Sequence, residues 1–200
     1  MSVTKRDSQY HTYGDYLIWS RTHGDELIDG TAYVREPPSP TYFHQAIAGE
    51  IHIQLASVLD PNAWEAIIAP MDVRLPKSTE PDADIDTVVQ PDVLIVSANH
   101  DVDKRGVRGA PAWLAEVLSP ATARYDQTIK IPRYERAGVP EVWLINLTTK
   151  SLSIYRLSEG RYGLPTVTGL QGTTTLTAVP GAVIDWDRIV AKVRRRDPEF

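Results

Sequence analysis

The chain of 200 residues contains no cysteine. This absence excludes a disulfide framework, a catalytic thiolate and any zinc site with cysteine ligands. Long hydrophobic runs are also lacking, because no apolar stretch approaches the roughly 20 residues needed to cross a bilayer. Residues 1–16 have no apolar core of the kind found in signal peptides. We therefore expect a soluble, cytoplasmic protein without membrane contact.

Positive charge is scarce, since 21 lysines and arginines stand against 26 aspartates and glutamates, a formal net charge of −5. This balance excludes a histone-like protein, whose affinity for nucleic acid comes from bulk positive charge. Local basic patches, such as residues 188–196, stay compatible with a nucleic-acid substrate. The composition, 42% hydrophobic and 24% charged, is typical of a globular protein. The length predicts a single domain over residues 1–200.

Hydrophobic periodicity and turn residues predict an α/β or α+β fold. Asp29-Gly30 is a dipeptide that a tight hairpin turn prefers, so we expect a hairpin at residues 26–34, after a helix at 12–20. Apolar residues three and four apart predict a long helix over residues 40–59, with Ser39 as its cap.

The rest of the chain alternates between compact apolar strands and helices. We expect strands at residues 66–69, 72–75, 88–96, 112–118, 142–146, 152–157, 162–167 and 174–176. Helices are expected at 121–137 and 185–193, the first kinked by Pro132 and ended by Gly138. This order predicts a central mixed β-sheet flanked by helices, with the N-terminal helix and hairpin added to it.

Two acidic residues lie inside strands that are otherwise apolar, Asp92 in Val-Val-Gln-Pro-Asp-Val-Leu-Ile-Val and Glu116 in Ala-Trp-Leu-Ala-Glu-Val-Leu-Ser. A carboxylate in such surroundings loses hydration, which costs several kcal/mol unless it is paired or holds a metal. Two converging carboxylates would repel each other, and a divalent cation such as Mg²⁺ or Mn²⁺ would relieve this repulsion. The alternative is that each acid lies at a strand end, where it caps a turn or pairs with an arginine.

The helix that follows the Glu116 strand carries Asp126, Lys130 and Tyr134 at intervals of four residues, so the three share one face. On spacing alone, a solvent-exposed Asp126–Lys130 pair is the simplest interpretation. The Tyr134 hydroxyl could accept a hydrogen bond from Lys130, although packing in the core is the simpler role for it.

Several short motifs occur in a fixed order along the chain: Glu-Leu-Ile-Asp-Gly (26–30), Pro-Pro-Ser-Pro (37–40) with His44, Gln-Pro-Asp (90–92), Glu-Val-Leu-Ser-Pro (116–120), Asp126, Lys130, Tyr134 and Gly-Val-Pro-Glu-Val-Trp (138–143). Together they resemble the Uma2 family of restriction-endonuclease-like proteins, a branch of the PD-(D/E)XK nuclease superfamily. The resemblance covers residues 13–186 and leaves a basic tail at 187–200. It implies a restriction-endonuclease-like core.

The superfamily usually places a lysine two residues after its second acid, a position that Leu118 occupies here. The resemblance implies that Lys130 takes over this role from the following helix. Asp92, Glu116 and the backbone carbonyl of Val117 would then hold one or two Mg²⁺ or Mn²⁺ ions for hydrolysis of DNA phosphodiester bonds. Lys130 would steer the attacking water or stabilise the developing charge.

Other polar residues have two interpretations each. Glu26 could complete the metal shell or be a solvated hairpin acid, and His44 could contact a phosphate, orient a ligand or be an ordinary surface residue. Lys104, Arg105 and Arg108, in one loop, could contact DNA phosphates or be solvated charges. Solvation is the simplest interpretation for Glu50, two turns after His44.

Two functions of different classes remain compatible with the residues. The first is a metal-dependent endonuclease that hydrolyses DNA, and the second is a catalytically inactive nuclease fold that binds nucleic acid or a protein. A glycosidase built on the two carboxylates is disfavoured, because the chain offers no aromatic platform for a sugar. A homodimer is possible, since cleavage of both strands of a DNA duplex needs two active sites.

Overall fold

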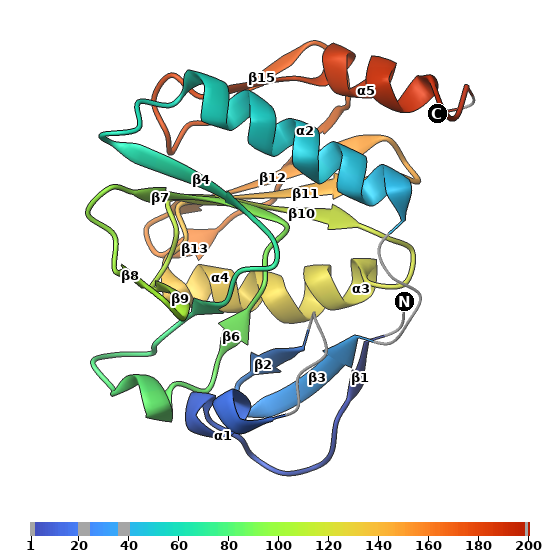
Figure 1. Ribbon diagram of the computed structural model, residues 1–200. Coiled ribbons are helices and arrows are strands. Elements are labelled where there is room, and N and C mark those ends of the chain that lie inside the picture. Colours follow the sequence, from blue (N-terminus) through green and yellow to red (C-terminus); the bar gives the residue numbers. More distant parts are fainter. Residues whose placement is uncertain (1–2, 20–24, 36–40, 199) are drawn as a thin grey trace.

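The computed structural model describes residues 3–19, 25–35, 41–198 and 200, and its elements form stacked layers (Figure 1). A mixed sheet occupies the middle. Helices α2 (Tyr42–Val58) and α5 (Trp186–Arg194) cover one of its faces, and α4 (Ile131–Ala137) lies on the other. A second sheet lies beyond α4, so this helix is enclosed between two sheets (Figure 1).

The central sheet has the strand order β13-β12-β11-β10-β7-β4, with β14 also paired to β12. Its strands are β4 (Trp64–Ile68), β7 (Val93–Ser97), β10 (Trp113–Leu118), β11 (Glu141–Asn146), β12 (Ser151–Ser158), β13 (Arg161–Tyr162) and β14 (Thr166–Gly169). Strand β10 runs parallel to β11 and antiparallel to β7. The expected α+β class with a mixed sheet flanked by helices is confirmed.

Side chains of β10 alternate between the two faces of this sheet. Trp113, Ala115 and Val117 belong to the hydrophobic cluster beneath α2 and α5, whereas Leu114 and Leu118 belong to the cluster around α4. Glu116 lies between Leu114 and Leu118 and therefore faces α4. This alternation explains how an acidic residue on an apolar strand comes to lie opposite a polar residue of the next helix.

The second sheet has the order β1-β3-β2-β6-β5-β9-β8 and was not predicted as a separate layer. Its strands are β1 (Val3–Lys5), β2 (Glu26–Ile28), β3 (Thr31–Arg35), β5 (Val73–Arg74), β6 (Val88–Val89), β8 (Val102–Asp103) and β9 (Gly106–Arg108). Helix α1 (Tyr13–Ile18) packs against this sheet through Tyr13 and Tyr16, and a further short pair joins β15 (Thr173–Thr175) to β16 (Val183–Asp185).

The prediction of one strand over residues 88–96 was wrong, because this segment divides between the two sheets. Strand β6 pairs with β2 and β5 in the second sheet, whereas β7 belongs to the central sheet. The break falls at Gln90-Pro91, and proline has no N–H with which to continue a ladder of hydrogen bonds. Asp92 therefore lies where the chain passes from one sheet to the other.

Two of the predicted N-terminal elements are confirmed, with one change of boundary. Asp29 and Gly30 have φ angles of 47° and 76°, the positive values that a tight hairpin turn requires. Helix α2 begins at Tyr42 rather than at residue 40, because Thr41 caps it by accepting a hydrogen bond from the backbone N–H of His44. The predicted cap, Ser39, lies outside the described residues, as do residues 37–40 of the proline motif.

The predicted helix over residues 121–137 is interrupted by a wider turn. It consists of α3 (Ala123–Tyr125), a π-helical turn over Asp126–Lys130, and α4. Pro132 lies in the first turn of α4 and supplies no N–H to the preceding turn, which is compatible with the widened backbone there. Gly138 ends α4 with a φ of 84°, as expected. In the described part of the chain, no helix has the length and apolar character of a membrane span.

Candidate active site

Asp92 and Glu116 come together at one end of the central sheet. Strands β7 and β10 are paired as far as Val93 and Ala115, so Asp92 directly precedes the paired part of β7 and Glu116 directly follows that of β10. The charge of Asp92 is one of those that raise the pKa of Glu116, so the two carboxyl groups lie near each other. Both side chains are buried, with 6% of Asp92 and 2% of Glu116 exposed. The structure thus brings the two acids together, and their role as metal ligands stays a prediction.

The Asp92 carboxylate is held from two sides. Its Oδ2 atom accepts a hydrogen bond from the backbone N–H of Val117 at 2.7 Å and lies 3.1 Å from His44 Nε2. Val117 lies two residues beyond Ala115, the last residue of β10 that pairs with β7, so the Asp92 side chain replaces the neighbouring strand as the partner of this N–H. His44 reaches Asp92 from the first turn of α2. His44 is therefore not an ordinary surface residue, whereas its contact with a phosphate or a ligand stays a prediction.

Lys130 lies between the two sheets and bridges them. Its Nζ atom is 2.5 Å from Glu116 Oε1 on β10 of the central sheet and 2.9 Å from Glu26 Oε1 on β2 of the second sheet. Asp126 Oδ1, in the same helical segment, is 3.8 Å from Nζ. The solvent-exposed Asp126–Lys130 pair, which spacing alone favoured, is wrong, because Lys130 has no exposed surface and Asp126 is also buried. The second sheet, which spacing along one helix could not reveal, covers them.

Two neighbouring residues fix this arrangement, and the sequence analysis did not assign these contacts. The Tyr134 hydroxyl donates to Glu116 Oε1 at 2.5 Å, and the Gln90 backbone N–H donates to Glu26 Oε1 at 2.7 Å. Burial, reinforced by the nearby Glu116 carboxylate, raises the pKa of Tyr134 well above its usual value, so the hydroxyl stays protonated and can donate. The four-residue spacing of Lys130 and Tyr134 indicated their shared face but not the strand residue that both contact.

The site holds more buried negative than positive charge. Glu26, Asp92, Glu116 and Asp126 are all buried, and Lys130 is the buried ammonium among them. Burial, together with the charges of Asp126, Asp92 and Glu26, raises the pKa of Glu116 to about 8, although the Lys130 ammonium acts in the opposite direction. Such an excess of buried carboxylates is unfavourable unless a further cation or proton compensates it.

The donor groups fit magnesium or manganese better than a metal that needs a complete protein cage. Within the described residues, no three histidine, aspartate or glutamate side chains form a ready-made metal site. Mg²⁺ does not require one, since it keeps several waters and is commonly bound by one or two carboxylates together with substrate phosphates. Lys130 and Tyr134 both contact the same oxygen of Glu116, Oε1. Asp92 and Glu116 are the residues that would hold such a cation, which would supply positive charge to this group of buried carboxylates.

The residues considered for DNA contact lie elsewhere. Lys104 and Arg105 are exposed at the turn between β8 and β9. Arg108 donates from Nε to Asp82 at 2.9 Å and from Nη2 to the carbonyl of Glu80 at 3.0 Å, which ties it to the acidic loop. In Figure 1, β8 and β9 lie at the left, whereas α3 and the first turn of α2 lie at the right. The structure does not bring this loop to the acid pair.

Glu50 is also placed differently from the expectation of a solvated side chain. It is buried, and its carboxylate lies 2.6 Å from Arg188 Nε and 2.8 Å from Lys192 Nζ. These ion pairs join α2 to α5 across the outer layer of the molecule. The amphipathic pattern of α2 identified the apolar face of that helix, but it could not show that a later helix packs beside Glu50.

Comparison with known proteins agrees with these observations. A family model described as "Uma2: Putative restriction endonuclease" matches residues 14–187. The chain belongs to the Uma2 family. A search of curated proteins found no significant match. Among solved structures, the protein resembles the crystal structure of a putative nuclease belonging to DUF820 from Anabaena variabilis, with 19% sequence identity and a TM-score of 0.70 over 90% of this chain and 97% of that one.

The structural likeness establishes the fold of this Uma2 member, and the family match extends over nearly the same residues as the motifs quoted above. The predicted family and the nuclease-like α+β architecture are therefore confirmed. Membership in a family of this description supports a nuclease function, that is, a hydrolase acting on nucleic acid.

Proposed function

We propose that this Uma2 protein is an endonuclease that hydrolyses DNA phosphodiester bonds with Mg²⁺ or Mn²⁺, as a single nuclease-like domain in the cytoplasm. The observation that carries the proposal is the 2.5 Å contact between Lys130 Nζ and Glu116 Oε1, next to Val117, whose N–H donates to Asp92. Two carboxylates and an amine in one buried place are the groups that metal-assisted phosphodiester hydrolysis needs.

Asp92, Glu116 and the backbone carbonyl of Val117 would hold the cation. Within a strand, the N–H and C=O of one residue point to the same side. Because the Val117 N–H is directed at Asp92, its carbonyl is directed to the same side of β10. A cation bound there would lower the pKa of a water molecule and offset negative charge on the phosphate. His44 would keep the Asp92 carboxylate in its orientation through Nε2 or contact the phosphate itself.

Lys130 would supply a fixed positive charge next to the reacting phosphate. Its ammonium is oriented in advance by Glu26 and Glu116, so it need not reorganise when charge develops. A compact ammonium suits this role, because it can donate to an attacking water or to a phosphate oxygen. Glu26 would act by holding the lysine charged and in place, and its backbone donor Gln90 would hold Glu26.

Contacts with the DNA backbone would come from basic residues outside the acid pair. Lys104 and Arg105 would add phosphate contacts at a distance from the acid pair, and Arg108 would support their loop through its bond to Asp82 or contact a phosphate in turn. Cleavage of both strands of a duplex would need two sites, which a homodimer would supply.

The alternative function is an inactive nuclease fold that binds nucleic acid or a protein. It is favoured by Leu118 at the position of the usual superfamily lysine and by the net charge of −5. The buried acids argue against it, because Glu26, Asp92, Glu116 and Asp126 outnumber the Lys130 ammonium among them, and a bound cation would compensate this excess.

A nuclease assay with matched variants tests the proposal. Purified protein is incubated with plasmid and with short single strands, with and without Mg²⁺ or Mn²⁺, beside Asp92→Asn and Lys130→Met. Asp101→Asn and Lys5→Met, both at exposed positions, serve as controls. The proposal expects cleavage that needs the metal, is lost in the first two variants and persists in the controls. Cleavage that persists in all four variants would come from a contaminant, and calorimetry should show Mn²⁺ uptake by the wild type but not by Asp92→Asn.

A further inference from the structure

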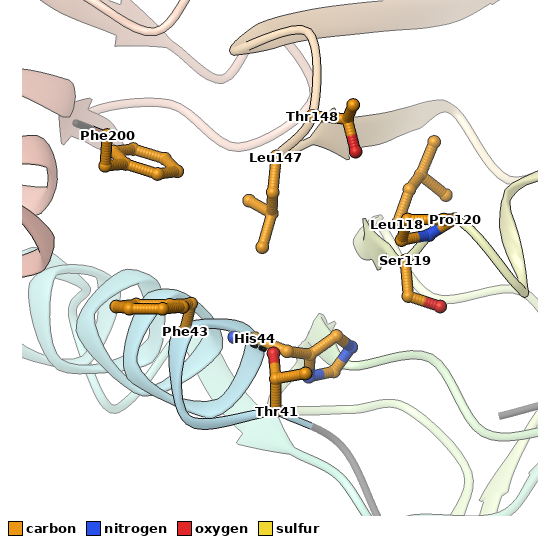
Figure 2. A pocket seen from close by; sticks show the side chains of 9 residues that line it. All are labelled: Thr41, Phe43, His44, Leu118, Ser119, Pro120, Leu147, Thr148 and Phe200. Atoms are coloured by element: carbon orange, nitrogen blue, oxygen red, sulfur yellow. Dashed lines mark hydrogen bonds between the residues drawn. The ribbon is translucent and has the colours of Figure 1, made fainter. Parts of the chain in front are cut away.

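A pocket of about 230 Å³ adjoins the acid pair, where the carboxyl end of β10 meets the first turn of α2 (Figure 2). His44 forms part of its wall, and the same side chain lies 3.1 Å from Asp92. The pocket is therefore separated from the proposed cation site by one imidazole ring. A molecule that places a phosphate at Asp92 and Glu116 would have its neighbouring part next to this pocket.

The lining of the pocket is mostly apolar. Figure 2 shows Phe43 and Phe200 at the left, Leu118 with Pro120 at the right, and Leu147 between them above His44. The lining residues include no aspartate, glutamate, lysine or arginine. Such a wall has no charged side chain that would offset the charge of a phosphate or a metal ion, and a buried charge without a partner is costly. The occupant that it favours is uncharged and has apolar faces.

Size restricts the occupant further. Pockets for drug-sized ligands have volumes of roughly 300–1,000 Å³, so a cavity of about 230 Å³ takes one small ring system. The aromatic rings of Phe43 and Phe200 in the wall offer stacking surfaces, and hydroxyl groups of Thr41 and Thr148 are available for polar edges. A nucleobase combines these features, since it is flat and uncharged and carries polar groups at its rim.

We infer that this pocket receives one unstacked nucleobase of the strand whose phosphodiester lies at Asp92 and Glu116. The inference rests on the proposed function for the position of the phosphate. A base within a duplex is paired and stacked, so it cannot enter a pocket without leaving the helix. The substrate class is therefore DNA with an unpaired base, either a single strand or a duplex with a base that is already displaced.

Binding measured without any divalent cation tests the pocket separately from hydrolysis. Short single strands with a fluorescent end label are titrated with wild-type protein, and an abasic site is placed at each position in turn. Loss of one stacked base weakens single-strand binding by about tenfold. We expect this loss at one position of the strand, and 2-aminopurine at that same position should change its fluorescence when the protein binds.

Matched tryptophan substitutions show whether the pocket is responsible for the loss of binding at the abasic position. Leu147→Trp and Thr148→Trp would fill the pocket from its wall and from its exposed rim. Leu164→Trp is the control, because Leu164 is 99% exposed between β13 and β14. We expect the first two proteins to bind intact and abasic strands equally and the control to retain the tenfold difference. Thr148→Trp keeps the test valid if Leu147→Trp fails to fold, since Thr148 is on the surface.

The results separate this inference from the proposed function. The inference that the pocket binds a base would be overturned if the wild type bound intact and abasic strands equally or did not bind single strands. This would hold even if the protein cleaves DNA with Mg²⁺. A loss of binding at one abasic position that disappears in Thr148→Trp but not in Leu164→Trp would support base binding in the pocket. If no cleavage occurred as well, hydrolysis would be the proposal that fails.

Discussion

Lys130 Nζ lies 2.9 Å from Glu26 Oε1, and this contact joins a helix to the second sheet, whereas the 2.5 Å contact of the same ammonium with Glu116 joins it to the central sheet. One buried cation thus connects three layers of the fold. Removal of either sheet would expose the lysine to water. The charge of the proposed site and the packing of the two sheets are consequently parts of one arrangement.

Lys130→Met should remove activity and also destabilise the protein. Methionine fills a similar volume, but the buried carboxylates of Glu26 and Glu116 lose their compensating charge. Removal of one partner from a buried ion pair costs about 3–5 kcal/mol. The free energy of unfolding, measured by urea denaturation at pH 7, should fall by this order. This decrease in the free energy of unfolding should be smaller at lower pH, because protonation of the carboxylates removes the uncompensated charge.

A double variant separates the two roles of Lys130. Adding Glu26→Gln to Lys130→Met removes one of the unpaired charges, so the free energy of unfolding should partly recover. Cleavage should not recover, because the ammonium is still missing. An active double variant would show that Lys130 serves the fold alone.

The sequence predicted the acid pair better than its surroundings. Asp92 and Glu116 were identifiable because an acid in an apolar strand is a local anomaly, visible within a few residues. Their neighbours depend on long-range pairing. The division of residues 88–96 between two sheets follows from which strands β6 and β7 meet, and no local pattern contains that information.

Burial of helical residues was predicted poorly for the same reason. Spacing shows which side chains share a helix face but not what covers that face. Spacing alone favoured a solvent-exposed Lys130, whereas the family resemblance implied a lysine directed at the acids, and Lys130 is enclosed because the second sheet lies against its helix. Glu50 was expected in solvent and is paired with α5, which follows much later in the chain.

The titration of Glu116 predicts how stability and metal binding depend on pH. Because burial raises its pKa from 4.5 to about 8 in the folded protein, the native state retains a proton that the unfolded chain releases. Without metal, the Glu116 contribution to the free energy of unfolding is present below pH 4.5 and is lost as the pH rises toward 8. Urea denaturation between pH 5 and pH 9 should show this decline, and Glu116→Gln should reduce it.

Mn²⁺ should reverse this decline in the free energy of unfolding with rising pH. The cation binds the ionised carboxylate of Glu116 and competes with the proton for it. We expect Mn²⁺ affinity, measured by calorimetry, to increase from pH 6 to pH 9 in the wild type as Glu116 ionises through its pKa of about 8. An affinity that is constant over this range would contradict the assignment of Glu116 as a ligand.

Tyr134→Phe should shift the pH dependence without removing the site. The Tyr134 hydroxyl donates to Glu116 Oε1, and a donor favours the ionised form of a carboxyl group. Its loss should raise the pKa of Glu116 further, so that the rate of cleavage at pH 7 falls and recovers at higher pH. Tyr162→Phe is a matched control, because the Tyr162 hydroxyl donates to the carbonyl of Val139 instead. Equal pH profiles for the two variants would remove Tyr134 from the site.

Glu50→Gln should have a much smaller effect than Lys130→Met, although both residues are buried and ion-paired. The partners of Glu50, Arg188 and Lys192, have side chains that are 56% and 41% exposed, so water can solvate them when the carboxylate is removed. Pairs with exposed partners contribute about 0–1 kcal/mol, and we expect a decrease of this order in the free energy of unfolding. Cleavage per folded molecule should be unchanged, because Glu50 contacts α5 and not the acid pair. A loss of cleavage in a stable Glu50→Gln protein would instead place this glutamate in the reaction.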